Sequence, residues 1–480
     1  MNFNSLEFLI FFPVVLLLYW LLPHRIRRWL LLAASYLFYL WWNPWTGFLL
    51  LGTTFISWLS ARRMERADSQ RSRKLWLLLA LVCCLGCLAV FKYAGFLTDT
   101  AGSVVRLLGG EGFDGTVDLV LPVGISFYTF QTLSYVLDMY RGEIRTEPDL
   151  GYYALFVSFF PQLVAGPIER PDHLLPQLKE RHRFQASGLY CGVCLLCRGY
   201  FKKLVVADGL SALVDRVYAA PRAATGPAIA LATVAFAVQI YCDFSGYSDI
   251  AQGAARMLGI RLMDNFRRPY AAKSVRAFWR RWHISLTSWF TDYLYKPLGG
   301  SRRGLVRQCV NIMIVFLVSG LWHGADWTFV VWGGFLGLCQ VAGLLWQRAG
   351  GPALPDNRLT GLLRQGRTFL LVTFAWIFFR AGSLEEAGLL LRGLTAGWNG
   401  AGWQSALSLL ALTGDAALRA ALAILCLLLL ERVDWSRGTD ETAGAVSAAQ
   451  AVFFLVSTAA VAWLALLAAN GENAFLYFQF

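Results

Sequence analysis

The sequence predicts an all-α, polytopic membrane protein. Apolar residues make up 57% of the 480 positions and charged residues only 15%, whereas about a quarter of the residues in a soluble domain are charged. Apolar runs long enough to cross a bilayer recur along the chain. The 19 Trp and 34 Phe residues suit a protein with many contacts to lipid and to the membrane interface. We therefore expect one integral membrane domain over residues 1–480.

The apolar runs predict about eleven transmembrane helices, with re-entrant and amphipathic pieces between them. Residues 151–165 run into PQLVAGP, whose prolines and glycine favour a broken or re-entrant segment. Residues 188–219 predict a long helix or a broken pair. The polar run CDFSGYSD follows residue 241, and residues 471–480 are expected to pack back on the bundle. The expected spans are residues 6–22, 29–42, 45–60, 75–96, 119–140, 227–241, 310–321, 327–346, 367–379, 405–430 and 446–468.

The charges of the connecting loops predict the orientation of the chain. Basic residues concentrate just after residue 22 and in residues 62–74. Two spans separate these loops, so the positive-inside rule places both in the cytoplasm. Residues 98–118 carry four acidic residues and one arginine, as expected for an external loop, and the N-terminus is then outside too. Because the basic residues lie between apolar runs, the net charge of +13 reflects topology and not a nucleic-acid-binding surface.

The ten cysteines lie mostly inside apolar runs, where they act as small buried hydrophobic residues. Cys191, Cys194 and Cys197 form CxxCxxC, a spacing found in iron–sulfur sites but also suited to a helix face that needs small groups. No fourth cysteine or histidine completes the set nearby. We therefore expect no metal site and no bound cofactor.

Two histidines are the candidate catalytic residues, and both lie in the predicted catalytic region, residues 243–335. His323 separates two apolar runs, so it lies near the membrane, where an ionisable side chain is costly unless the protein uses it. His283 is predicted to share a helix face with Trp279. A neutral imidazole can accept the proton of a hydroxyl nucleophile, while a purely structural role is the alternative. The remaining histidines are predicted in polar loops: His24, His173 and His182.

Residues 261–307 contain eleven Lys or Arg against two acidic residues. This basic segment can anchor on anionic lipid, or its arginines can bind the phosphates of a coenzyme A donor, and the two roles are compatible. A zinc site from the two histidines and an aspartate is a further alternative, although no spacing fixes it. The candidate residues for binding donor or substrate are Arg276, Arg280, Arg281, Trp279, Trp282, Trp322, Asp243 and Asp249.

Several long motifs resemble the membrane-bound O-acyltransferase family, in the branch of alginate O-acetylation membrane proteins. The resemblance covers almost the whole chain and identifies His323, in its WHG motif, with the family's catalytic histidine and His283 with its second histidine. The motifs are SLEFLIFFPVV, ASYLFY, VFKYAGF, LPVGISFYTFQTLSYVLDMYRG, LVAGPIERP, FKKLVVAD, YCDFSGYSDIAQG, FWRRWHISLTSWFTDYLYKPLGG, GLWHGADWTFVVWG, WIFFRA and FLYFQF.

The resemblance implies a ring of helices around a thin centre, with a cytoplasmic and an external funnel meeting near His323. It implies acetyl transfer in the bacterial inner membrane from a cytoplasmic donor, acetyl-coenzyme A, to an exported polysaccharide such as alginate, through a periplasmic or secreted partner. His323 would act as general base while His283, or nearby tryptophans, positions the carbonyl. Alternatives are D-alanyl or other acyl transfer to a cell-wall polymer, and a polysaccharide transporter or scaffold without chemistry, although no paired repeat of the transporter type occurs.

Overall fold

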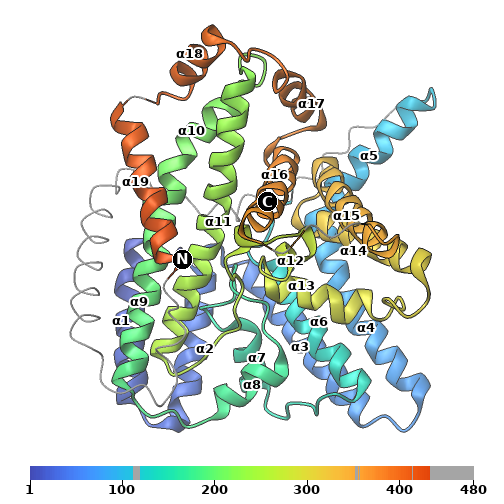
Figure 1. Cartoon of the computed structure of the whole chain (residues 1–480). Coiled ribbons are helices and arrows are strands. Elements are labelled where there is room, and N and C mark those ends of the chain that lie inside the picture. Colours follow the sequence, from blue (N-terminus) through green and yellow to red (C-terminus); the bar gives the residue numbers. More distant parts are fainter. Residues whose placement is uncertain (112–118, 352–354, 356, 413, 433–480) are drawn as a thin grey trace. The chain divides into compact units, whose positions relative to one another are not determined.

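The computed structural model describes residues 1–111, 119–351, 355, 357–412 and 414–432, and these residues form helices joined by turns (Figure 1). They divide into two compact units, one made of Met1–Val193 with Ile250–Met263 and the other of Cys194–Asp249 with Asp264–Phe480. We call them the first and second unit. The expected all-α class is confirmed for the described residues, while the single domain, the ring and the funnels stay predictions.

The first unit holds the N-terminal helices. Its elements are α1 (Leu6–Leu21), α2 (His24–Leu40), α3 (Thr46–Glu65), α4 (Gln70–Leu88), the π-helix η1 (Ala89–Tyr93), α5 (Ala94–Leu107), α6 (Ile125–Arg141), α7 (Leu150–Ser158), α8 (Pro171–Lys179), and parts of α9 (Ala186–Tyr200) and α11 (Gly226–Met257). Helix α3 packs on α4 and α6, and α2 packs on α7. Aromatic rings of α1, α2 and the turn after α7 form a core at Phe8, Phe11, Phe38 and Phe160.

The second unit holds the rest of α9 and α11 and all later helices. Its further elements are the π-helix η2 (Phe201–Ala207), α10 (Asp208–Tyr218), the 3₁₀-helix η3 (Pro269–Ala271), α12 (Val275–Trp279), α13 (Ile284–Phe290), the π-helix η4 (Thr291–Tyr295), α14 (Leu305–His323), α15 (Trp327–Arg348), α16 (Arg358–Arg380), α17 (Leu384–Gly393), α18 (Gly400–Leu409) and α19 (Gly414–Leu430).

Helices α14 and α15 pack closely against each other in the second unit, and glycines permit it. A Cβ on Gly320 would lie 2.3 Å from the carbonyl oxygen of Phe329, and a Cβ on Gly333 would lie 2.3 Å from that of Phe316. Small residues let helix backbones pack closely where lipid gives no hydrophobic drive between helices. This contact fixes the end of α14, where His323 is the last residue.

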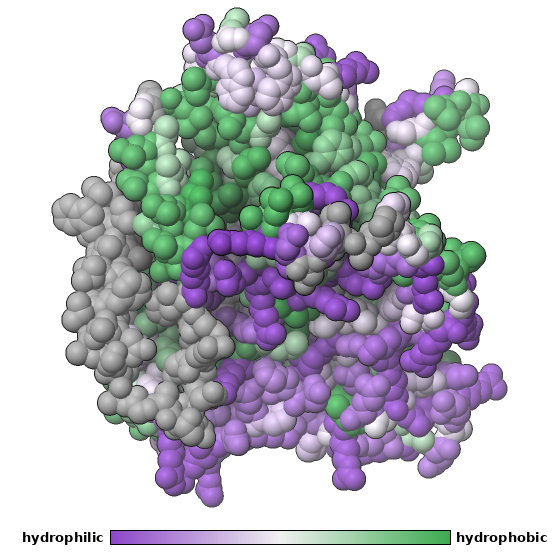
Figure 2. All heavy atoms as spheres, viewed as in Figure 1, coloured by the Kyte–Doolittle hydropathy of each residue, from purple (hydrophilic) through white to green (hydrophobic). Residues whose placement is uncertain are grey.

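Five helical stretches among the described residues are long and apolar enough to cross a membrane, and the bent pair α18–α19 would make a sixth. The multi-pass membrane character is therefore confirmed, but the count of about eleven spans stays a prediction. The apolar face of α19 is exposed, and Figure 2 shows apolar side chains over the region of α10, α11 and α19. The five stretches are Gln70–Leu107, Gly226–Met257, Leu305–His323, Trp327–Arg348 and Arg358–Arg380.

Three sequence expectations need correction. Residues 98–107, expected in an external loop, are helical instead, because α4, η1 and α5 continue without a break to Leu107, while the external position of residues 98–118 stays a prediction. The span expected to end at residue 241 continues through CDFSGYSD to Met257, since ion pairs described below balance its carboxylates. The helix expected around His283 is interrupted. By contrast, the broken segment after α7 is confirmed by turns over residues 159–166. The expected span 446–468 and the terminal 471–480 lie outside the described residues.

Candidate active site

His323 lies in an aromatic box within the second unit. It is the last residue of α14 and only 5% exposed. Its ring centroid lies 5.1 Å from that of Trp332 on α15 and 5.5 Å from that of Phe379 on α16, both in edge or T-shaped contacts. The chain turns sharply afterwards because a Cβ on Gly324 would lie 2.0 Å from the ring of Phe329. The surrounding aromatic rings therefore keep most water away from the imidazole.

His283 lies beside His323, with 6.3 Å between the two ring centroids. Its side chain is fully buried. The ring of Phe244, on α11, contacts it edge-on at 4.7 Å, and the ring of Trp322 lies 5.7 Å away. The structure thus brings together both histidines and Trp322, the residues that the sequence predicted at the reacting centre. Their catalytic roles stay predictions.

The backbone at His283 differs from the expected helix. Helix α12 ends at Trp279, and His283 precedes α13 with φ 45° and ψ 55°, in the left-handed region. A non-glycine residue is uncommon in this region. It persists only where contacts with the surrounding structure hold it there, often at functional sites. The expected helical face shared by His283 and Trp279 is therefore wrong. A smooth 3.6-residue pattern continues across the break, so periodicity alone could not reveal it.

Two short segments pair to hold that strained residue. The Arg267 backbone N–H donates to the Arg281 carbonyl at 2.9 Å, and the Ile284 N–H donates to the Asn265 carbonyl at 3.0 Å. Phe266 and Trp282 form an isolated antiparallel bridge between them. The backbone on both sides of His283 is thereby tied to residues 265–267, a contact that the sequence analysis did not predict.

Asn265 also reaches the imidazole directly. Its side chain is 1% exposed, and its Oδ1 lies 3.1 Å from His283 Nδ1. The Ser285 hydroxyl donates to the same oxygen at 3.0 Å. Burial lowers the pKa of His283 to about 3, because removing a charge from water disfavours the protonated ring. His283 is therefore neutral at physiological pH.

The three arginines that precede His283 lie on α12 and directly after it, and they share no single helix face. Arg276 lies within α12, Arg280 caps its end and is exposed, and Arg281 is partly exposed. Trp279 and Trp282 are instead buried: Trp279 packs edge-on against Trp332 at 5.8 Å, and Trp282 lies 5.2 Å from the ring of Trp376. Their burial indicates a packing role, whereas contact with a donor stays a prediction for all five residues.

Asp243 and Asp249 are buried on α11 and form ion pairs. Lys203 donates to Asp243 at 2.9 Å, and Lys202 lies 3.0 Å from Asp249, which Arg198 also contacts at 2.8 Å. Both lysines lie on the π-helix η2. The helices cross closely at Gly246, where a Cβ would lie 2.9 Å from the Gly199 carbonyl oxygen. These carboxylates thus fix α11 against η2, and a role in binding substrate stays a prediction.

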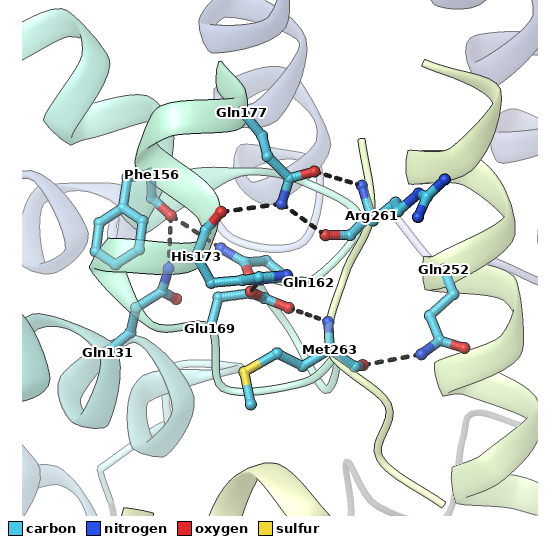
Figure 3. A network of polar contacts seen from close by, with 9 residues as sticks. All are labelled: Gln131, Phe156, Gln162, Glu169, His173, Gln177, Gln252, Arg261 and Met263. Atoms are coloured by element: carbon cyan, nitrogen blue, oxygen red, sulfur yellow. Dashed lines mark hydrogen bonds and ion pairs between the residues drawn. The ribbon is translucent and has the colours of Figure 1, made fainter. Parts of the chain in front are cut away.

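The first unit contains a polar network that the sequence analysis missed (Figure 3). Gln177 exchanges two hydrogen bonds with the backbone of Arg261, at 2.8 and 3.0 Å. Glu169 accepts from the Met263 N–H at 2.5 Å, and Gln252 donates to the Met263 carbonyl at 2.8 Å. Side chains therefore satisfy the backbone of residues 261–263 much as a neighbouring strand would.

His173 completes that network and contradicts its expected place in a loop. It lies on α8, and its Nδ1 is 2.6 Å from Glu169 Oε2. The Glu169 side chain is fully buried, while that of His173 is 40% exposed. The hydrogen bond to Glu169 raises the pKa of His173. Burial raises the pKa of Glu169, against the hydrogen bond from His173. The signal that could have found this pair is the i, i+4 spacing in GPIERPDH.

No group of three or more His, Cys, Asp or Glu side chains in the described part of the chain could hold a metal ion. Cys191 and Cys194 are buried on α9, in keeping with the helix-face interpretation.

The chain is similar in sequence to several known membrane acyltransferases. The chain is 42% identical to the probable alginate O-acetylase of Pseudomonas aeruginosa, over 81% of this chain and 73% of that protein. It is 37% identical to the probable alginate O-acetylase of Pseudomonas putida over the full length of both chains. A peptidoglycan O-acetyltransferase of Helicobacter pylori is 34% identical over 83% of this chain and 80% of its own length. The model of the membrane-bound O-acyltransferase family matches residues 37–379, the region that holds both histidines. The chain belongs to the membrane-bound O-acyltransferase family and is an O-acyltransferase.

Proposed function

We propose that this chain is a membrane O-acetyltransferase that moves an acetyl group from cytoplasmic acetyl-coenzyme A towards an exported polysaccharide such as alginate. The observation that carries the proposal is the buried His323–His283 pair, in a chain with relatives in two Pseudomonas species that are named probable alginate O-acetylases. We place the protein in the bacterial inner membrane with its N-terminus outside, and a periplasmic or secreted partner would deliver the acetyl group to the polymer.

His323 would act as the general base. The acceptor hydroxyl oxygen forms a bond to the thioester carbonyl carbon, its proton passes to an imidazole nitrogen of His323, and the carbon–sulfur bond breaks. The coenzyme A thiolate leaves and takes up a proton. An imidazole has a pKa suited to this exchange near neutral pH. The aromatic rings of Trp332 and Phe379 keep water away from the thioester.

Replacement of His323 tests this role. His323→Ala should lower acetyl transfer at least about 100-fold, because a positioned general base contributes about 10²–10⁴-fold. The measurement is transfer of labelled acetyl from acetyl-coenzyme A by purified protein in vesicles, with the acceptor partner outside. His24→Ala, at the start of α2 in the other unit, is the matched control and should retain activity. Normal turnover by a folded His323→Ala protein would remove His323 as the base.

The exposed arginines at the end of α12 would bind the donor phosphates. If they do, Arg280→Gln/Arg281→Gln should raise the KM for acetyl-coenzyme A while kcat changes less, because such contacts bind ground state and transition state alike. Each lost charged contact is worth about 1.5–3 kcal/mol, or roughly tenfold or more in KM. Arg302→Gln/Arg303→Gln removes two other exposed arginines of the basic segment and should change KM little.

This measurement is made in neutral detergent, where anionic lipid is absent. An unchanged KM for the Arg280→Gln/Arg281→Gln protein would leave lipid anchoring as the role of the basic segment.

A further inference from the structure

Asn265 is a buried polar residue that contacts the ring of His283. It comes from the segment between α11 and η3, is 1% exposed, and uses both its backbone and its side chain on the His283 loop. Its carbonyl oxygen accepts from the Ile284 N–H, the residue after His283, at 3.0 Å. The backbone bond places Asn265 beside the His283 loop, and its amide side chain is held there by hydrogen bonds to His283, Ser285 and Ser248.

The hydrogen bonds of Asn265 fix which way its amide points. The Ser285 backbone N–H lies 3.4 Å from Oδ1, and a backbone N–H can only donate. Turning the amide over would set its NH₂ group against that N–H. In the observed orientation Nδ2 donates to the Ser248 hydroxyl at 3.4 Å. The atom that meets His283 Nδ1 is therefore an amide oxygen, which can only accept.

An accepting oxygen at Nδ1 decides the tautomer of the ring. Nδ1 must carry the proton in order to donate at 3.1 Å, and in a neutral imidazole the other nitrogen, Nε2, then carries the lone pair. We infer that Asn265 is a positioning residue that keeps the proton of a neutral His283 on Nδ1 and so makes Nε2 a hydrogen-bond acceptor. The partner of this second histidine is then a donor, such as the hydroxyl of the acceptor substrate.

This inference rests on the proposed acetyl transfer and changes one role within it. A neutral His283 that holds its proton on Nδ1 cannot donate from Nε2 to the thioester carbonyl oxygen, so the carbonyl-positioning role expected from the family resemblance does not fit. Instead His283 would orient the acceptor hydroxyl for attack while His323 removes its proton. The rings that contact His283 include those of Phe244, Trp322 and His323, so the two imidazoles lie side by side.

The test reads the tautomer without depending on activity. The chain has five histidines, so ¹⁵N-histidine labelling of the full-length protein gives few imidazole signals, and the one lost in His283→Gln assigns His283. We expect a neutral ring with a protonated Nδ1 and a bare Nε2 from pH 5 to 8. A proton on Nε2 in the wild-type protein would overturn the inference, whatever the enzyme's activity.

Two substitutions then separate positioning from simple support. Asn265→Leu removes the acceptor, so the signal should redistribute between tautomers and kcat should fall about 10–100-fold, as when an orienting partner of a functional histidine is lost. Asn265→Asp keeps an acceptor but adds a charge, so His283 should become protonated near neutral pH and activity should recover as pH is raised. If Asn265 had only a structural role, the activity of Asn265→Asp would not recover at higher pH.

The control is Asn311→Leu. Asn311 is a fully buried asparagine of α14 whose amide donates to the backbone carbonyls of Leu298 and Gly300, and its replacement should leave the His283 signal unchanged. If Asn265→Leu does not fold, the wild-type and Asn265→Asp spectra decide the question. If the wild-type protein transfers no acetyl group but shows the Nδ1–H tautomer, the proposed function fails and the tautomer assignment stands.

Discussion

His173 in the first unit and His283 in the second are both held by a buried side chain, yet their charges respond in opposite ways. His173 is 40% exposed and binds the fully buried carboxylate of Glu169, so its pKa is raised. His283 is fully buried and binds a neutral amide, so nothing offsets desolvation and its pKa falls to about 3. The comparison shows that the burial of the ring and the charge of its partner together decide which protonation state a histidine keeps.

A buried ion pair in the second unit should show the largest effect on the free energy of unfolding. Lys203 is 1% exposed and lies 2.8 Å from Asp208 and 2.9 Å from Asp243. Lys203→Met should lower the free energy of unfolding by about 3–5 kcal/mol, because it leaves Asp243 buried without its cation. Thermal unfolding in detergent measures the loss. Lys203→Arg keeps the charge and should lose far less. If both variants unfold alike, packing and not charge is what Lys203 supplies.

The change in unfolding free energy as the pH falls tests whether His283 is neutral in the folded protein. Its folded pKa of about 3 lies below the unfolded value near 6.5. The stability from keeping this ring neutral is therefore present above pH 6.5 and is lost as pH falls through the interval towards 3. Relative to His283→Gln, which keeps an N–H donor for Asn265 and does not titrate, the wild-type protein should lose about 1.4 kcal/mol for each pH unit below 6.5.

The measurement is the unfolding free energy of both proteins at a series of pH values, reported as their difference. Equal slopes for the two proteins between pH 6.5 and 5 would mean that the pKa of His283 is the same in the folded and the unfolded protein. The contrast with His173 would then disappear.

The change in unfolding free energy as the pH rises tests the His173–Glu169 pair and should be the smallest of these effects. The folded pKa of His173 is raised above 6.5, so the pair's contribution is present below pH 6.5 and is lost as pH rises through the folded pKa. At pH 6 the wild-type protein should exceed Glu169→Gln in stability by about 1 kcal/mol, the usual worth of one hydrogen bond. That difference should shrink by pH 9.

Glu180→Gln removes an exposed carboxylate directly after α8 and serves as the control, with little expected change at either pH. A difference between the wild-type protein and Glu169→Gln that grows with pH would contradict the assigned direction of the His173 shift.

The sequence alone determined the class of this protein and the two residues at its centre. Long apolar runs require backbone hydrogen bonds within each segment, so composition was enough to predict helices that cross a membrane. The position of His323 between two such runs predicted a functional histidine, because an unused ionisable group there is costly. These inferences depend on local pattern and length, which the sequence states directly.

Tertiary structure decided what surrounds those residues. No periodicity in the sequence predicts the left-handed backbone of His283. Nor does it predict that Asn265 contacts His283, eighteen positions further along the chain, or that Glu169 and Gln177 bind the backbone of residues 261–263. The same holds for Asp243, which the sequence offered as a substrate contact and the structure pairs with Lys203. Such contacts follow from close packing and from the cost of leaving a buried polar group without a partner. Both depend on which distant segments meet, and the chain reveals that only when it is folded.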